Sequence, residues 1–215
     1  MKNKLFASLL SAGLLMSATS AMAAGDAAKG EAMAAPCAAC HGSDGNSPSP
    51  MFPKIAGLGE KYLTNQLKMI RDGERNIPEM VGQLDGKSDQ QLADMAAFFS
   101  SKSTQLAGAK DAELKLNSGE VVSALEFGEQ VYRAGNLETK VPACTGCHSP
   151  RGQGNPPAGF PRLSGQYAEY IEKQLLAFRS GERSTDGEAK IMRSVAEHMS
   201  DAEIKAVSAY ISGLY

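Results

Sequence analysis

Apolar residues recur along the chain at the three- to four-residue spacing of amphipathic helices, and no segment shows a strand pattern that competes with them. In residues 60–72, for example, Leu63, Leu67 and Ile70 share one face, and Gly73 follows the last turn. Serine residues with Gln or Glu three positions later mark the starts of other helices. We therefore expect helices at 26–35, 60–72, 88–101, 121–134, 168–180 and 200–214.

The chain repeats itself at a nearly constant offset in residue number. With one and the same offset, Phe52-Pro53-Lys54 reappears as Phe160-Pro161-Arg162, Tyr62 as Tyr170, and Gly73-Glu74-Arg75 as Gly181-Glu182-Arg183. Such an offset indicates two copies of one unit of about 90 residues. The sequence therefore predicts an all-α fold with two tandem domains, residues 24–101 and 120–215, joined by a linker at residues 102–119.

Each copy contains the sequence Cys-x-x-Cys-His, which is the attachment motif of c-type haem. Two thiols three positions apart reach the two vinyl groups of one porphyrin, and the adjacent histidine places its imidazole on the iron. The two motifs use all the cysteines of the chain, Cys37, Cys40, Cys144 and Cys147. The sequence therefore predicts two covalently bound haem c groups, with His41 and His148 as the proximal iron ligands.

Other uses of four cysteines fit the pattern less well. The two pairs are separated by about 103 residues, far more than the roughly 15–20 residues within a four-cysteine zinc ribbon. No βαβ pattern surrounds either pair, as a redox Cys-x-x-Cys motif requires. Structural disulfides are compatible with export. They do not explain why a histidine directly follows the second cysteine in both motifs.

The N-terminus has the pattern of a secretory signal peptide. Lys2 and Lys4 precede an apolar run, and Ala21-Met22-Ala23 has the small residues of a cleavage site. The apolar run is too short to span a bilayer, and no later apolar stretch reaches about 18 residues. We expect the signal at residues 1–23 and a soluble mature protein in a bacterial periplasm. Removing the two lysines leaves 20 basic and 24 acidic residues, a net charge of −4, which argues against nucleic acid as a partner.

The repeat also indicates what fills the distal position of each iron. One histidine, His198, lies outside the two motifs, so the candidates are the methionines and His198. Met80 lies eight residues before Ser88, and Met192 lies eight residues before Ser200. No other pair of methionines aligns with itself in this way, so we expect these two, in loops before the last helix of each domain, to be the distal ligands. A thioether ligand raises the reduction potential relative to a second histidine.

Simpler roles are expected for the neighbouring residues. Met95 lies at helical spacing and should fill the core. His198 and Met199 directly precede a capping serine and should lie in a surface turn. Two locations suit the basic residues Lys54, Lys61, Arg162 and Arg183. They lie near the haem edges or, more simply, on a solvated surface.

A proline follows each motif at a similar spacing. Pro53 comes after His41 and Pro161 after His148, and the two spacings differ by a single position. A backbone carbonyl at these positions would accept the second ring N–H of the imidazole and so orient it. Shaping of the loop alone explains the prolines equally well, and composition does not distinguish the two roles.

Cys-x-x-Cys-His, a proline at this spacing after it and a methionine before a C-terminal helix together resemble class I cytochromes c. Two such domains in tandem resemble the cytochrome c4 family, as do the segments Cys-His-Gly-x-Asp-Gly-Asn-Ser-Pro at 40–48, Phe-Pro-Lys-Ile-Ala-Gly at 52–57 and Ala-Lys-Ile-Met-Arg at 189–193. The resemblance covers nearly all of the mature chain. It departs at 149–151, where Ser-Pro-Arg replaces the Gly-x-Asp that follows the first motif.

The resemblance implies two class I domains related by a pseudo-twofold axis, with the haem propionates near their interface. Its site residues would be the distal ligands Met80 and Met192, the proximal acceptors Pro53 and Pro161, and, near the propionates, Tyr62 and Tyr170. It further implies a monomeric periplasmic electron carrier, sometimes loosely associated with the membrane. Such a carrier would connect a quinol-oxidising respiratory complex with a terminal oxidase, often of the cbb3 type.

The motifs are compatible with three functions. In an electron carrier, which is not an enzyme, each iron cycles between ferric and ferrous with no bond made or broken. A dihaem enzyme, such as a peroxidase or a thiosulfate-oxidising protein, needs an open or displaceable distal site, and the aligned methionines argue against one. A cytochrome subunit of a partner dehydrogenase, such as a flavoprotein, would have the same chemistry as the carrier, and a stoichiometric flavoprotein would purify with it. We expect the carrier.

Overall fold

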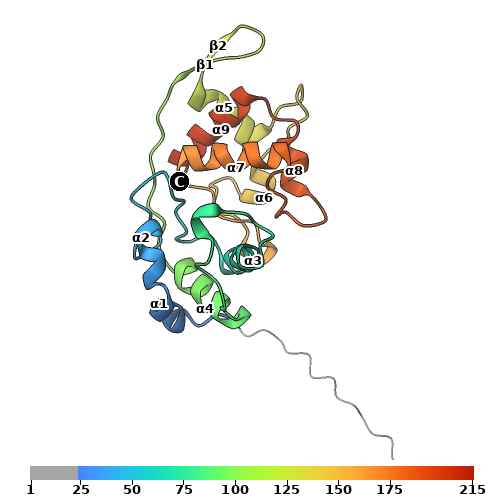
Figure 1. The fold of residues 1–215 in the computed structure, drawn as a ribbon. Coiled ribbons are helices and arrows are strands. Elements are labelled where there is room, and N and C mark those ends of the chain that lie inside the picture. Colours follow the sequence, from blue (N-terminus) through green and yellow to red (C-terminus); the bar gives the residue numbers. More distant parts are fainter. Residues whose placement is uncertain (1–23) are drawn as a thin grey trace, which may run out of the picture.

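The computed structural model describes residues 24–215, and the expected signal peptide at 1–23 lies outside them. Figure 1 shows two groups of helices joined by a long connecting segment. The first group contains α1 (Ala27–Met33), α2 (Ala38–His41), α3 (Glu60–Arg71) and α4 (Asp89–Ser100), with 3-10 turns at Ala35–Cys37 and Pro78–Met80. The second contains α5 (Ala124–Ala134), α6 (Thr145–His148), α7 (Ala168–Ser180), α8 (Ile191–Ala196) and α9 (Asp201–Gly213), with a 3-10 turn at Pro156–Ala158.

The last helix of each domain begins at the expected capping box. The Ser88 hydroxyl accepts the backbone N–H of Gln91, and the Gln91 side chain accepts the N–H of Ser88. Ser200 and Glu203 make the same pair of bonds at the start of α9. Because these side chains satisfy backbone donors that the helix itself leaves free, the helix starts are fixed by local sequence, and both were predicted correctly.

Within each domain the first and last helices cross at a glycine. A Cβ atom at Gly30 of α1 would lie 2.0 Å from the carbonyl oxygen of Asp94 in α4. A Cβ atom at Gly128 of α5 would lie 2.1 Å from the carbonyl oxygen of Ala206 in α9. Since no side chain fits at either distance, both domains depend on the same close approach of two backbones, as expected of duplicated units.

The connecting segment contains a hairpin that the sequence pattern did not predict. Strands β1 (Glu113–Lys115) and β2 (Val121–Ser123) pair antiparallel, with Lys115 opposite Val121 at the end nearest the turn. The helix expected from residue 121 begins only at Ala124, because the Ser123 hydroxyl accepts the N–H of Glu126 and caps α5 there. The β-branched pair at 121–122 favours an extended backbone, and strands this short give no alternating pattern over several residues.

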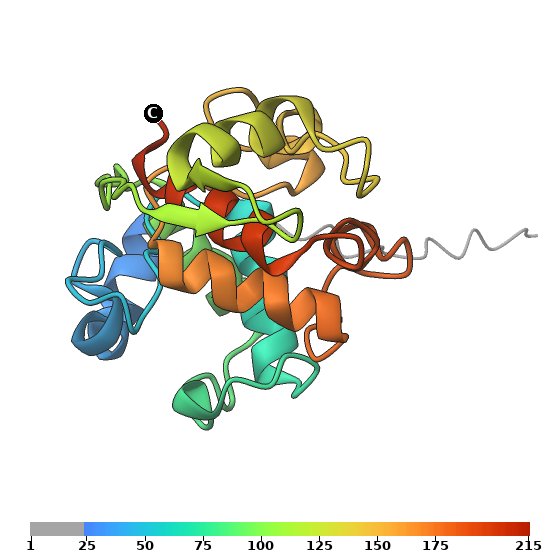
Figure 2. The same cartoon turned by 90° about the horizontal axis from the view of Figure 1, so that it is seen from above.

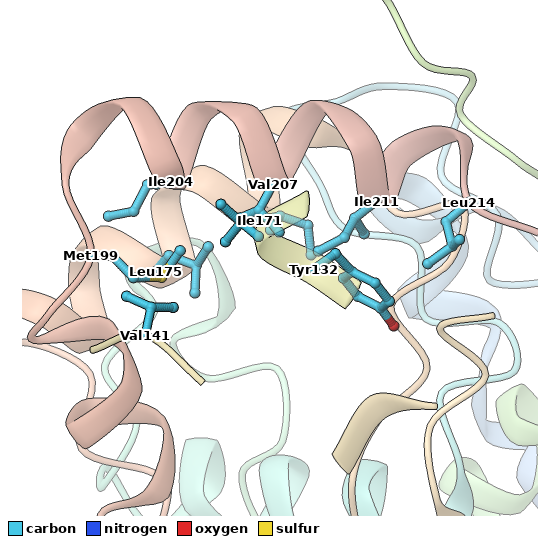
Figure 3. Close-up of a cluster of buried hydrophobic side chains, with 10 residues drawn as sticks. Tyr132, Val141, Ile171, Leu175, Met199, Ile204, Val207, Ile211 and Leu214 are labelled. Atoms are coloured by element: carbon cyan, nitrogen blue, oxygen red, sulfur yellow. The ribbon is translucent and has the colours of Figure 1, made fainter. Parts of the chain in front are cut away.

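The core of the second domain lies along one side of α9, where Figure 3 shows the buried side chains facing one another. These residues are Val131, Tyr132, Val141, Ile171, Leu175, Met199, Ile204, Val207, Ile211 and Leu214. Met199 was expected in a surface turn, but only 4% of it is exposed. It precedes the capping residue and packs in one cluster with Ile204 of the first turn, the arrangement of a hydrophobic staple. Met95 lies in the core of the first domain, as predicted.

Gln166 of the second domain bonds to the backbone of Lys54 in the first domain. The Oε1 atom of Gln166 accepts the N–H of Lys54 at 3.0 Å, and its Nε2 atom donates to the carbonyl of Lys54 at 2.8 Å. Lys54 was expected on the surface but is buried, with its ammonium on the carbonyl of Gln105 and over the ring of Tyr167. Burial lowers the pKa of this ammonium. The exposure of Lys61 agrees with the expectation.

Replacing Gln166 with alanine should destabilise the contact between the domains. The change leaves the N–H and the carbonyl of Lys54 without their partners, at about 1–3 kcal/mol for each buried group. We expect the free energy of unfolding to fall by about 2–4 kcal/mol in urea titrations of the holoprotein. The exposed Gln153 offers a matched control, and Gln153→Ala should leave the midpoint nearly unchanged. Equal effects of the two changes would show that the bonds to Lys54 contribute little.

The helices of residues 24–215 are all too short or too polar to cross a membrane.

Candidate haem sites

The two Cys-x-x-Cys-His motifs fold in the same way. In the first domain the 3-10 turn Ala35–Cys37 leads into α2, which ends at His41. In the second, Cys144 precedes α6, which ends at His148. The two cysteines and the histidine of each motif occupy positions i, i+3 and i+4 of one turn and therefore share a face. All four cysteines lie within the described residues, are half-buried and form no disulfide with one another.

Each motif histidine is buried and bonded to the carbonyl expected from the proline positions. Nδ1 of His41 lies 2.9 Å from the oxygen of Pro53, and Nδ1 of His148 lies 3.0 Å from the oxygen of Pro161. A ring nitrogen that donates to a carbonyl leaves the lone pair on Nε2, the form that a metal needs. Burial lowers the pKa of both histidines, while the hydrogen bonds oppose this effect, so both imidazoles are neutral near pH 7.

A phenylalanine packs beside each of these histidines. The ring centroids of Phe52 and His41 are 6.4 Å apart, and those of Phe160 and His148 are 6.1 Å apart, both edge to face. The sequence pattern alone assigned these phenylalanines no role in the site. Their alignment with each other in the repeat was the signal that could have found them.

The two aligned methionines each lie against the apolar cluster that also holds a motif cysteine. Met80 packs on the cluster of Leu84, Leu92 and Met95, which Cys37 also contacts. Met192 packs on the large cluster of the second domain together with Cys144. Neither lies in a plain loop as expected: Met80 ends a 3-10 turn and Met192 belongs to the short helix α8, while His198 is exposed. Each domain thus brings one motif cysteine and its aligned methionine to the same apolar cluster.

The second motif departs from the first at the residue after its histidine. Gly42 has a φ of 76°, and Ser149, at the corresponding place, has a φ of 69°, which is unusual for a residue with a Cβ atom. The Ser149 carbonyl accepts the hydroxyl of the buried Tyr132 at 2.7 Å, and its own hydroxyl accepts the N–H of Gln153 at 2.9 Å. These two bonds offset the strain of the left-handed backbone.

Between the domains lies a group of polar side chains, which we call the interface cluster. Its members come in pairs related by the same offset as the rest of the repeat: Tyr62 and Tyr170, Gln66 and Gln174, Arg75 and Arg183. The tyrosines and glutamines stand on α3 and α7, which overlap when the molecule is seen from above (Figure 2). The symmetry of the pairs agrees with a pseudo-twofold relation between the domains.

The bonds of the interface cluster cross from one domain to the other. Arg75 donates to Tyr170 and Gln174, each at 3.1 Å, and to Gln66 of its own domain at 2.8 Å. Arg183 donates to Tyr62 and Gln66, each at 3.0 Å, and to Gln174 of its own domain at 2.7 Å. Each guanidinium therefore binds both domains, and the expectation of a surface role for Arg183 was wrong.

The positive charge of the interface cluster has no counterion within the described chain. No carboxylate of residues 24–215 forms an ion pair with either arginine; their partners are amides and hydroxyls. Burial raises the pKa of Tyr62, but the charges of Arg183 and Arg75 outweigh this effect and leave its pKa lowered. Two half-buried cations held together form a site for anionic groups.

The donor set fits haem c in both domains. In each, the motif offers two thiols and a neutral imidazole with Nε2 free, and a thioether lies against the same apolar region. When bound, haem c supplies an iron couple that takes up and returns one electron. The carbonyls of the two prolines orient the imidazoles, and each methionine packs against an apolar cluster. This duplicated arrangement defines a c-type cytochrome with two haem sites.

Comparison with known proteins agrees with this class. The family model described as Cytochrome c matches residues 27–103 and 126–214. The cytochrome c4 of Pseudomonas aeruginosa is 50% identical over 214 residues, covering 99% of this chain and 100% of that protein. The crystal structure of reduced recombinant cytochrome c4 from Pseudomonas stutzeri superposes with a TM-score of 0.81 at 47% identity, covering 89% of this chain and all of that one. The chain belongs to the cytochrome c4 family, binds two covalent haem c groups and is a dihaem electron carrier.

A second kind of relative has a more specific name. The thiosulfate dehydrogenase electron acceptor of Thiomonas intermedia is 36% identical over 180 residues, covering 83% of this chain and 78% of that protein.

A buried carboxylate fixes the segment before the second motif. Glu203 is 1% exposed, and its Oε1 atom accepts bonds from Asn136 at 2.8 Å and Thr139 at 2.6 Å. Its Oε2 atom accepts the N–H and the hydroxyl of Ser200, both at 2.7 Å. Burial raises the pKa of this carboxyl, but the bonds outweigh burial, and the pKa lies below its usual value. Glu203 thereby ties Asn136 and Thr139, which precede the second motif, to the start of α9.

The depressed pKa of Glu203 makes part of the stability dependent on pH. Its contribution is fully present above the unfolded pKa of about 4.3 and is lost as the pH falls through the lower folded pKa. Relative to the natural protein, Glu203→Gln should lose about 1–3 kcal/mol at pH 7, with a smaller difference near pH 3. Urea titrations at both pH values measure this, and Glu120→Gln, at an exposed carboxyl, should show no such difference. A constant difference at both pH values would contradict the assignment.

Proposed function

We propose that the chain is exported after removal of residues 1–23 and works in the bacterial periplasm as a monomeric electron carrier. It accepts electrons from a quinol-oxidising respiratory complex and delivers them to a terminal oxidase. It has no catalytic residues of its own. The observation that carries the proposal is the duplicated arrangement of thiols, carbonyl-oriented imidazole and thioether. Such sites exchange electrons without exchanging ligands.

In this proposal the irons are bound axially by His41 and Met80 in the first domain and by His148 and Met192 in the second. The carbonyls of Pro53 and Pro161 hold the proximal imidazoles. The domains span residues 24–101 and 120–215, and residues 102–119 link them. A filled distal position favours electron transfer over substrate binding, because no iron site is open.

The interface cluster would receive the haem propionates. Arg75 and Arg183 supply two positive charges without a counterion in residues 24–215, and Tyr62 and Tyr170 supply hydroxyls beside them. Propionates are carboxylates, for which planar guanidinium groups are suited donors. Because each arginine contacts both domains, the two haem groups would be held at a fixed separation, as transfer between them requires.

The proposal is tested with isolated membranes and the purified holoprotein. Addition of a quinol should reduce both haems when the quinol-oxidising complex is present, and an inhibitor of that complex should prevent it. Once the haems are reduced, addition of the inhibitor in the presence of an active terminal oxidase should let them reoxidise. Reduction at the same rate with the complex inhibited or absent would contradict the proposed donor.

A second candidate function is suggested by the relative from Thiomonas intermedia, whose name describes an acceptor of electrons from thiosulfate dehydrogenase. In this alternative the chain serves as the cytochrome partner or subunit of a dehydrogenase. Stopped-flow mixing with a thiosulfate dehydrogenase and thiosulfate separates the two candidates. Rapid reduction there, with slow reduction by the quinol-oxidising complex, would favour the alternative. A flavoprotein that copurifies at a constant ratio would indicate a different dehydrogenase.

A further inference from the structure

The segment that carries Met192 is closed by a buried ion pair. The Asp186 carboxylate accepts Nε of Arg193 at 2.7 Å through Oδ1 and the backbone N–H of Arg193 at 2.9 Å through Oδ2. Its side chain is 4% exposed, and that of Arg193 is 25% exposed. The guanidinium also donates to the carbonyl of Gly187 at 3.1 Å. Both oxygens of the carboxylate therefore accept hydrogen bonds from Arg193, the residue directly after Met192.

This pair fixes the short helix α8 as well as the segment before it. The N–H of Arg193 belongs to the first turn of α8, where an acidic acceptor is favoured. Lys190 enters the helix with a φ of 49°, a left-handed conformation that persists only where the surroundings impose it. Residues 184–189, which include the aspartate, contain about four residues more than the first copy has there. The second domain therefore contains an ion pair beside its methionine that the first domain lacks.

The segment around Met80 lacks any comparable bond. Among the described residues, no side chain of 76–86 takes part in a hydrogen bond or an ion pair. Its 3-10 turn is held by backbone bonds, such as Met80 N–H to the carbonyl of Ile77 at 2.9 Å, and by the packing of Leu84. Val81 stands where the second domain has Arg193, and it is 75% exposed.

We propose that the Asp186–Arg193 pair is a positioning device for Met192, and that the first domain consequently releases its distal methionine more readily than the second. The inference rests on the proposed axial ligands. It predicts that the distal methionine dissociates more readily in one domain than in the other, although both domains have the same donor set. An added small ligand that competes for iron would enter the first domain first.

Titration of the ferric holoprotein with imidazole tests this, followed by the loss of the iron–thioether absorption. Two phases are expected in the natural protein, the first at a concentration at least about tenfold lower, since a bond to a charged group is worth about a factor of ten or more. Met80→Ala should abolish the first phase and Met192→Ala the second, because each removes one iron–thioether bond and leaves the other. Asp186→Asn should lower the midpoint of the second phase about tenfold. Asp85→Asn, at an exposed acid of the first domain's segment, should move neither.

Arg193→Gln breaks the pair from its other side and should reproduce the effect, with haem content and thermal unfolding measured on each variant. The inference fails if the second domain's phase comes first in the natural protein, a test that needs no change to the pair, or if Asp186→Asn leaves the second midpoint in place. If Met80→Ala and Met192→Ala abolish neither phase, the proposed ligands are wrong as well, so the two failures are distinguishable.

Discussion

Replacing Met192 with alanine is expected to open the distal site of one haem and leave the other haem as it is. No other candidate of the second domain is placed to replace the thioether, because His198 is exposed and Met199 belongs to the core. The iron–thioether absorption of the ferric protein should fall to about half, and carbon monoxide should bind one of the two reduced haems. The reduction potential of that haem should fall, since a thioether ligand raises it. Met80→Ala should do the same in the first domain.

Two neighbouring methionines provide matched controls for this prediction. Met199 and Met95 are buried in the same clusters as the proposed ligands, at 4% and 2% exposure. Changing either to alanine should cost about 2–5 kcal/mol of stability, the usual effect of a core cavity, without altering the absorption. The ligand assignment is wrong if Met192→Ala keeps the full thioether absorption, or if Met199→Ala removes it.

Changing both Arg75 and Arg183 to leucine should lower the reduction potentials of both haems. A nearby positive charge stabilises the form with the added electron, and these arginines have no counterion in residues 24–215. For a general pair of unit charges separated by about 12 Å, at an effective dielectric constant near 20, the interaction is about 1.4 kcal/mol. This corresponds to about 60 mV for a one-electron couple, so potentiometric titration should resolve the change.

The same double variant should also loosen the contact between the domains, since both arginines donate across it. Arg133→Gln is a suitable control, because Arg133 is exposed and pairs with Glu129 on the surface of α5. It should leave both potentials within a few millivolts of their original values, as expected for a screened surface charge. Unchanged potentials in the double variant would place the haem propionates away from the interface cluster.

Features fixed by neighbours in the sequence could be predicted. The capping boxes at Ser88 and Ser200 set the last helices because the caps act on backbone groups three residues away. The comparison of the two copies aligned Met80 with Met192 and also indicated the offset that relates the members of the interface cluster. A second copy of the pattern supplied the information that a single copy lacks.

Features that depend on contacts between distant segments could not be predicted. Lys54 is buried because Gln166, in the other domain, binds its backbone, and charge alone favoured the surface. Met199 lies in the core because α9 turns it inward, whereas its place before a cap also fits an exposed turn. Asp186 lies in a segment that is longer in the second copy, and its partner Arg193 stands where the first copy has Val81, so comparison of the copies does not indicate the pair.

The most direct test of the account is the visible spectrum of the purified holoprotein, oxidised and reduced, with and without carbon monoxide, together with a haem count. The account predicts two haems per chain, both low-spin and both unaffected by the gas, because a methionine fills each distal site. A high-spin haem, or one that binds carbon monoxide in the unmodified protein, would mean an open iron site and would contradict the electron-carrier account.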